Sequence, residues 1–551
     1  DLTPVPKARA NIVALSDALP TQVAITINDR DPKLFDLVTL DLLTGKRVGE
    51  VQNTDEFGDY TVDHLLRVRV ATKKLPDGSA EIYTTTAANN PAKRTWDKFD
   101  TIGPLDADSS QVIAVSPDDR TLYMTDSRAS DTGGVVAVDI KTKKQTVLGT
   151  DPKAEASDTI IDPHTGKLQA ISFEYDRVRW QVLDKAIAPD LAAMAKLAPG
   201  GDAAIVARTQ DDKQWIVASF TEQKPGEYWL WNRAAHKGTL LFDSRPELAR
   251  YKLAPMTSVV ILARDGLQLV SYLTLPVDSH GDGETTPKQP LPMVLLVHGG
   301  PWSRDSWGPN PIHQLLANRG YAVLSVNYRG STNFGKKFLN AGNLQWGKAM
   351  HTDLLDAVAW ATKAGIAAPN QICIMGGSYG GYATLAGLTM TPDVFACGVD
   401  IVGPSNLLTL LATIPPYWAP LVSMFHTRMG DPTTPEGKAI LVEASPLTHA
   451  AAIKRPLLIG QGANDPRVNQ AESEQIVAAM QKHGLPVSYA LFPDEGHGFH
   501  RPENNIAFFG VAEAFLSAHL GGYYLPLTKE EVSASSMQIK SGAEGIPGLP
   551  H

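Results

Sequence analysis

The chain has 551 residues, of which 43% are hydrophobic and 20% charged, and its formal net charge is −9. This length exceeds what one hydrophobic core supports, so two or more domains are expected. The mild negative charge argues against nucleic acid as a partner, and no apolar run is long enough to predict a membrane span. The two cysteines, Cys373 and Cys397, lie in apolar segments and are expected to be buried free thiols. No signal-peptide pattern follows Asp1, which leaves both the cytoplasm and the periplasm open for a soluble protein.

Residues 1–254 are predicted to form an all-β propeller domain. The same scheme of short strands and polar turns recurs in four stretches, 22–51, 111–149, 158–184 and 202–243. The recurrence of roughly 40 to 45 residues suits a four-stranded propeller blade, and a β-sandwich is the alternative. About five to six blades are expected. Residues 1–20 look like the end of a unit, which favours a propeller that is incomplete at its N-terminal side.

Residues 255–525 are predicted to form an α/β-hydrolase domain with a doubly wound, mostly parallel sheet. Apolar strands alternate here with amphipathic helices such as 352–365 and 469–484. Strand-then-helix alternation indicates a parallel sheet that is covered on both faces. Residues 526–551 are expected to form a C-terminal tail.

The segment 371–387 (QICIMGGSYGGYATLAG) joins a predicted strand to a predicted helix through glycines around one serine. This could be an ordinary turn, because glycine supplies positive φ and serine is common in turns. The pattern G-x-S-x-G is also that of a nucleophile elbow, which lifts a serine above a sheet edge. Active residues gather at the carboxyl ends of parallel strands. We therefore predict that Ser378 is a nucleophile.

A serine hydroxyl needs a base, and in this sheet type the base is a histidine late in the chain. Two histidines, His497 and His500, closely follow a late predicted strand. His497 lies between two glycines, where its ring can reach the serine, and it is the predicted base. We expect His500 to pack in the loop or face solvent, and His483 to lie at a helix end.

The orienting acid has three candidate regions. Asp494 and Glu495 precede the histidine and are expected to form a turn, whereas Asp400 is expected to take a structural hydrogen bond within its strand. Asp465 comes just past a strand end, in a glycine-rich loop followed by Pro466. We therefore predict Asp465 as the acid.

Acyl transfer also requires donors for the developing oxyanion. The backbone N–H of Tyr379, directly after the serine, is one predicted donor. The second is expected in the loop 298–301 (HGGP), through the backbone of Gly300. His298 precedes the serine and belongs to this loop, so it is rejected as the base.

Five motifs together resemble the prolyl oligopeptidase family of serine peptidases, most closely its acylaminoacyl-peptidase and dipeptidyl-peptidase-like branches. They are HGGP (298–301), NYRGS (327–331), GGSYGGY (376–382), NDPRV (464–468) and GHGF (496–499). The resemblance implies a triad of Ser378, Asp465 and His497 and a propeller that screens substrates by size. It also implies that Arg467 binds a substrate carbonyl, and we expect His298 and Trp302 to contact substrate. The predicted propeller is shorter than the about seven or eight blades usual in such relatives, which puts size selection in doubt.

The predicted function is hydrolysis of short peptides by a serine peptidase. An esterase or amidase that acts on small acyl compounds with the same triad is the alternative, and a non-catalytic binding protein is a third possibility. No metal-ligand spacing or nucleotide-binding loop is found, so we expect no metal and no cofactor. Homo-oligomerisation is left open, as are exo- or endopeptidase action and the state of the substrate's amino terminus.

Overall fold

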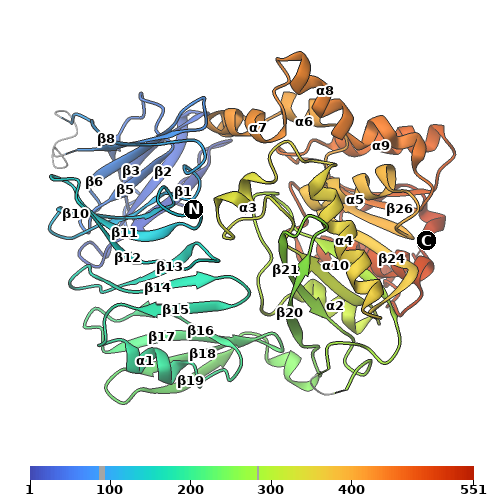
Figure 1. The fold of residues 1–551 in the computed structure, drawn as a ribbon, viewed down its shortest axis with the longest axis horizontal. Helices are drawn as coiled ribbons and strands as arrows, with labels where there is room; N and C mark the ends of the chain where they lie inside the picture. Colours follow the sequence, from blue (N-terminus) through green and yellow to red (C-terminus); the bar gives the residue numbers. More distant parts are fainter. Residues whose placement is uncertain (86–93, 282–283, 551) are drawn as a thin grey trace.

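The computed structural model describes residues 1–85, 94–281 and 284–550. Figure 1 shows small β-sheets stacked on one side and a mixed α/β body on the other, with the chain passing from the first to the second in the green segment. The predicted fold class, a β-propeller followed by an α/β-hydrolase domain, is confirmed.

Five antiparallel sheets form the propeller blades, four of them with four strands and one with three. Their strands are β1 (Ala10–Leu15), β2 (Gln22–Asp31), β3 (Leu34–Asp41) and β4 (Arg47–Val51); β5 (Asp59–Val62), β6 (Val68–Lys74), β7 (Ala80–Thr84) and β8 (Asp97–Ile102); β9 (Val112–Val115), β10 (Thr121–Asp126), β11 (Gly134–Asp139) and β12 (Gln145–Gly149); β13 (Ala156–Ile161), β14 (Leu168–Glu174) and β15 (Val178–Val182); and β16 (Asp202–Arg208), β17 (Gln214–Thr221), β18 (Lys224–Asn232) and β19 (Lys237–Asp243). A short helix, α1 (Ala188–Met194), precedes the fifth blade.

Alternating side chains explain why these segments form blades. In β10 every second residue is buried, and Leu122 and Met124 pack into a cluster with Val70 and Ile82 of the neighbouring blade. The turn before β4 is closed by an aspartate whose Oδ1 accepts a hydrogen bond from the backbone N–H three residues later, at 2.8 Å. The same bond recurs before β12 and before β14. This recurring turn chemistry is what the sequence repeat records.

A nine-stranded sheet forms the centre of the second domain, in the order β20-β21-β23-β22-β24-β25-β26-β27-β28. Its strands are β20 (Met256–Leu262), β21 (Gln268–Thr274), β22 (Leu291–Val297), β23 (Ala322–Val326), β24 (Ala367–Gly377), β25 (Cys397–Ile401), β26 (Leu457–Gly462), β27 (Val487–Phe492) and β28 (Gln538–Ser541). The six neighbours from β23 to β27 pair in parallel, and the outer strands add antiparallel pairs.

Helices cover both faces of this sheet, so apolar clusters lie on each side of it. The helices are α2 (Pro311–Asn318), α3 (Lys336–Asn340), α4 (Ala349–Lys363), α5 (Tyr379–Met390), α6 (Leu407–Ala412), α7 (Val422–Met429), α8 (Pro435–Ala444), α9 (Gln470–Lys482), α10 (Pro502–Leu520) and α11 (Lys529–Ala534). Cys373 and Cys397 face each other in the register of β24 and β25 and are buried free thiols, as predicted.

The segment 526–551, expected as a tail, carries α11 and β28 in its described part. β28 pairs with β27 and so adds the last strand to the sheet. None of the described helices combines the length and apolar character needed to cross a bilayer.

Candidate active site

Ser378 is the single residue between β24 and α5, and its φ of 59° lies in the left-handed region. A Cβ at Gly380 would lie 2.1 Å from the carbonyl oxygen of Val297, and one at Gly376 would lie 2.5 Å from the same oxygen. Only glycine tolerates such approaches. The strained serine is therefore held by close backbone packing between the turn and β22, as expected of a nucleophile elbow.

Asp465 and His497 follow the carboxyl ends of β26 and β27, the strands beyond β25 in the same sheet. The ring Nδ1 of His497 lies 2.6 Å from Asp465 Oδ2, and Asp465 is fully buried at its side chain. The other carboxylate oxygen accepts the backbone N–H groups of Arg467 at 2.8 Å and Val468 at 3.0 Å. Three donors thus fix this carboxylate beside the histidine ring.

Glu495 fixes the loop that carries the histidine. Its buried carboxylate accepts hydrogen bonds from the backbone N–H groups of His500 and Arg501 and from the Asn504 side chain. Burial would raise the pKa of Glu495, but these bonds outweigh it and hold the pKa below its usual value. The sequence indicated only a turn former here, because Asn504 lies in a different element, α10.

Within the described residues, no hydrogen bond joins Ser378 to His497. Because Asp465 binds Nδ1, the Nε2 atom of the ring stays available to a serine hydroxyl. Catalytic hydrogen bonds are often long in a ligand-free site and tighten when substrate binds.

The loop that follows β22 lies directly against the elbow. A Cβ at Gly299 would lie 3.4 Å from Ser378 Cβ, so the backbone of this loop passes beside the serine. Gly300 has a φ of 123°, which favours glycine. Tyr379 is the first residue of α5, where backbone N–H groups lack partners within the helix and the helix dipole favours negative charge. These two backbones therefore both adjoin the serine.

Stacked aromatic rings connect the loop after β22 to the start of α5. The His298 ring stacks on Tyr328 at 4.4 Å between centroids, and Tyr328 stacks on Tyr379 at 5.1 Å. Trp346 contacts Tyr379 edge-on, with 4.6 Å between the ring centroids. The loop after β22 and the start of α5 therefore cannot shift independently of each other.

His298 has both ring nitrogens within hydrogen-bond distance of protein atoms: Nδ1 lies 2.8 Å from the Gly299 carbonyl and Nε2 lies 3.0 Å from Ser331 Oγ. Burial lowers the pKa of His298 to about 4, so the ring is neutral at physiological pH. This geometry supports a role in shaping the loop. The expected contact of His298 with substrate stays a prediction.

Arg467 and Trp302 belong to an aromatic wall next to the Asp465 loop, a row of side chains formed with Trp418 and Phe425. The Arg467 guanidinium lies 5.7 Å over the Trp418 ring, and Phe425 packs between Trp418 and Trp302 at 5.6 and 5.5 Å. No carboxylate among the described residues pairs with the Arg467 side chain. The guanidinium donors of Arg467 are therefore available to a ligand. Phe425 and Trp418 were not identified from the sequence, because no motif marks them.

The residues rejected as catalytic lie in other settings. Asp494 pairs with Arg501, the side chain of His500 is exposed, and His483 ends α9. Asp400 is fully buried in β25, and its Oδ1 accepts the N–H of Gly403 at 2.8 Å. Its Oδ2 has no partner among the described residues. Burial raises the pKa of Asp400 to about 7, and Asp400 does not contact the His497 ring.

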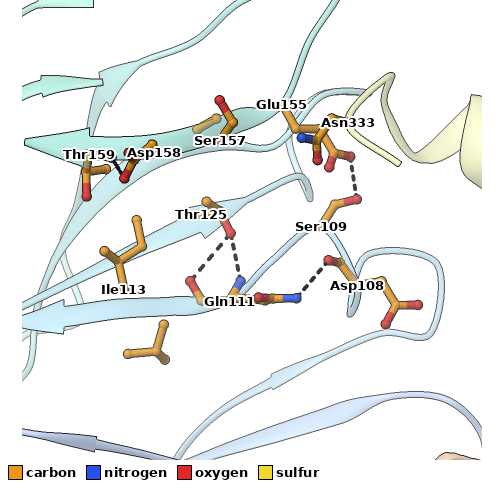
Figure 2. Close-up of a pocket in the computed structure, with 12 residues that line it drawn as sticks. Asp108, Ser109, Gln111, Ile113, Thr125, Glu155, Ser157, Asp158, Thr159 and Asn333 are labelled. Atoms are coloured by element: carbon orange, nitrogen blue, oxygen red, sulfur yellow. Dashed lines mark hydrogen bonds between the residues drawn. The ribbon is translucent and has the colours of Figure 1, made fainter. Parts of the chain in front are cut away.

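A polar hollow of about 350 Å³ lies on the propeller side of the domain boundary. Figure 2 shows Glu155 and Ser109 of the propeller beside Asn333 of the second domain, with the Glu155 carboxylate bonded to the Ser109 hydroxyl at 2.5 Å. Burial raises the pKa of Glu155. Asn333 lies two residues after Ser331, so the hollow adjoins the loop that supports His298.

A family model described as "Prolyl oligopeptidase family" matches residues 309–523. Dipeptidyl aminopeptidase BIII of Pseudoxanthomonas mexicana is 50% identical over 551 residues, which cover 100% of this chain and 79% of that protein. Dipeptidyl peptidase family member 6 of Caenorhabditis elegans is 36% identical over 98% of this chain and 75% of its own length. The chain belongs to the prolyl oligopeptidase family. It is a serine-type peptidase, as the sequence motifs predicted.

Solved structures support the fold of this peptidase. A puromycin-hydrolyzing peptidase of Mycobacterium tuberculosis has a TM-score of 0.74 at 20% identity and covers 94% of this chain and 80% of its own. An acylaminoacyl peptidase of Pyrococcus horikoshii has a TM-score of 0.63 at 17% identity, over 95% and 90% of the two chains. Within the described residues, no group of three or more His, Cys, Asp or Glu side chains is arranged to hold a metal ion.

The buried Asp400 gives a prediction for stability against pH. Its pKa is about 7 in the folded chain and near 3.9 when unfolded, so the unfolded state binds fewer protons between these values. Stability is therefore lost as pH rises from about 4 to 7. Asp400→Asn keeps the bond to Gly403 and removes this loss. The thermal unfolding midpoint of the variant should therefore rise relative to that of the parent as pH increases from 4 to 8. The corresponding gain in the free energy of unfolding is at most roughly 4 kcal/mol.

Asp431→Asn is the control, because Asp431 has a lowered pKa from its bonds to Thr433. This variant should show no gain at higher pH. A constant difference between Asp400→Asn and the parent across the pH range would contradict the neutral state of Asp400.

Proposed function

We propose that this peptidase cleaves short peptides through an acyl-enzyme, with Ser378 as nucleophile, His497 as base and Asp465 as the orienting acid. The observation that carries the proposal is the 2.6 Å bond from His497 Nδ1 to Asp465, at the same sheet edge as the strained Ser378 turn. Their order along the chain, Ser then Asp then His, is that of α/β-hydrolases.

In the first step the Ser378 hydroxyl attacks the scissile carbonyl carbon while His497 Nε2 takes its proton. The oxygen that becomes negative accepts hydrogen bonds from the backbone N–H groups of Tyr379 and Gly300. His497 then gives the proton to the leaving amine, and Asp465 stabilises the charged ring throughout. A water molecule, activated by the same histidine, hydrolyses the acyl-enzyme.

Arg467 is proposed to hold a carbonyl of the peptide on the acyl side. Its backbone is fixed by Asp465, and its guanidinium lies over Trp418 without a carboxylate partner among the described residues. A charged planar donor suits a peptide carbonyl. Trp302 and Phe425 on the same wall would contact apolar parts of the substrate.

The relatives favour release of dipeptides from a free amino terminus. Two relatives that match nearly the whole chain are named dipeptidyl aminopeptidase BIII and dipeptidyl peptidase family member 6, at 50% and 36% identity. Acylamino-acid-releasing enzymes, such as that of Homo sapiens at 29% identity, match 43% of this chain. Release of an acylated amino acid is therefore the second candidate.

Contacts between the domains support a size limit set by the propeller. Lys336 of α3 donates to Asp106 at 2.6 Å, and Arg428 of α7 pairs with Asp108 of the propeller. These bonds hold the propeller across the side of the catalytic domain that carries α3 and α7. Large folded substrates would have to break them to enter.

The nucleophile is tested by Ser378→Ala. Turnover should fall toward the order of a million-fold, because no other group can form the acyl-enzyme. A fluorophosphonate should label the parent at Ser378 and leave the variant unlabelled. The unfolding midpoint serves as the folding control, and residual activity within tenfold of the parent would contradict the mechanism.

Substrate choice is tested with matched p-nitroanilides. A dipeptide derivative with a free amine should be hydrolysed at least about tenfold faster, in kcat/KM, than its N-acetylated form, because dipeptide release requires a site for the charged amine and one charge-assisted bond is worth roughly 1.5–3 kcal/mol. An acetyl-aminoacyl derivative tests the second candidate. Preference for an acylated substrate would contradict dipeptide release and leave the triad untouched.

Arg467→Ala separates peptidase from simple esterase action. Loss of one charge-assisted bond should reduce kcat/KM on peptide substrates about 10- to 150-fold. Hydrolysis of p-nitrophenyl acetate, which has no second carbonyl, should hardly change. Equal losses on both substrates would mean that Arg467 only supports the loop of Asp465.

A further inference from the structure

Arg304 lies four residues after Gly300, in the loop that borders the elbow, and its side chain extends from the catalytic domain to the propeller. The guanidinium is only 7% exposed and reaches the end of β14, in the fourth propeller blade. Nη1 donates to the Glu174 carbonyl at 2.6 Å, and Nη2 donates to the Tyr175 carbonyl at 2.9 Å. The Glu174 carboxylate lies 3.5 Å away. A buried, fully engaged arginine is thus shared between the two domains.

Further contacts fix the arginine on the catalytic-domain side. Nη2 also lies 3.2 Å from the hydroxyl of Tyr272 in β21, and Nε donates to the Asp305 carbonyl at 3.1 Å. The guanidinium lies 4.5 Å over the Phe334 ring. Because the guanidinium is held by hydrogen bonds to both domains and by the Phe334 ring, the backbone at Arg304 has little freedom to move.

The neighbouring residues transmit this restraint to the loop. The Ser303 carbonyl accepts the N–H of Thr332 at 2.9 Å, and the backbone of Asp305 exchanges two hydrogen bonds with the Asn327 side chain. Toward the elbow, Trp302 packs against Phe425 and Arg428, and beyond Gly300 the His298 ring is bound through Ser331. Gly300 lies between these fixed residues, with a φ of 123°, and has no side chain of its own through which it could be held.

We infer that Arg304 is a positioning residue that fixes the oxyanion loop against the fourth blade, so that docking of the propeller sets the position of the Gly300 N–H. This inference rests on the proposed function, because it assigns Gly300 as a donor to the reacting carbonyl. The propeller then contributes to the rate of acyl transfer as well as to access. The fourth blade, which has only three strands, is the one that supplies the acceptors.

Arg304→Met keeps the apolar stem and removes all donors. Loss of one oxyanion donor costs about 100- to 1000-fold in kcat, and a misplaced donor costs less. The variant should lose about 10- to 100-fold in kcat on a dipeptidyl p-nitroanilide, with KM within threefold of the parent. It should also bind a dipeptidyl boronic acid, whose tetrahedral adduct uses the oxyanion donors, correspondingly more weakly. Arg304→Lys should recover part of the loss.

The contribution of the propeller to this contact is tested by Glu174→Gln, a substitution in the fourth blade. It should lower kcat a few fold in the parent and have no further effect in the Arg304→Met background, because the two residues act through one contact. Lys336→Met is the matched control, since it removes another cation shared with the propeller. The Lys336 side chain bonds Asp106 and Ser127 and, within the described residues, makes no hydrogen bond to the loop of Arg304. Its kcat should stay within twofold of the parent.

The outcomes separate the inference from the proposed function. An unchanged kcat in folded Arg304→Met, additive losses in the double variant, or an equal loss in Lys336→Met would overturn the positioning role while Ser378 labelling still supports the triad. If the parent is neither labelled by fluorophosphonate nor active on any peptide, the proposed function itself fails.

Discussion

The packing of two glycines against one carbonyl oxygen is the constraint on which the site depends. Gly376 and Gly380 allow the turn at Ser378 to approach the Val297 carbonyl at the end of β22. Because β22 and β24 are neighbours, the loop after β22 then passes beside the serine. A side chain at either glycine would separate the two strand ends and with them the proposed nucleophile and the loop proposed to hold the oxyanion. The elbow therefore positions two parts of the site at once.

The parallel order of the strands brings Asp465 and His497 to the same edge of the sheet as Ser378. β26 and β27 run parallel to β24, so the loops after them open on the same side of the sheet. What the topology leaves undetermined is fixed locally, by the N–H groups that hold Asp465 and by the Glu495 carboxylate that holds the loop of His497. Stacked rings from His298 to Trp346 do the same for the oxyanion side.

Much of this architecture could be predicted from the sequence because it is recorded in local patterns. Alternation and recurring aspartate turns indicate the blades, and a strand followed by glycines around a serine indicates the elbow. Glu495 and Trp418 could not be assigned, since their partners lie in other elements, α10 and α7, and no motif marks these contacts. Arg304 could not be assigned because its partners lie in the propeller, far away in the chain. β28 was missed as well, because four residues with mixed exposure carry little signal.

The contacts between the propeller and the catalytic domain reach the loop that follows β22. Arg428 pairs with Asp108 of the propeller and also lies 5.1 Å over Trp302, two residues beyond Gly300. Arg304 binds the fourth blade from the other side of the same loop. Two buried arginines thus connect the loop between them to two different blades. A movement that separates the domains would release both contacts together, so a site open to large substrates would also have a loosened loop after β22, and with it a less fixed position for the proposed oxyanion donor Gly300.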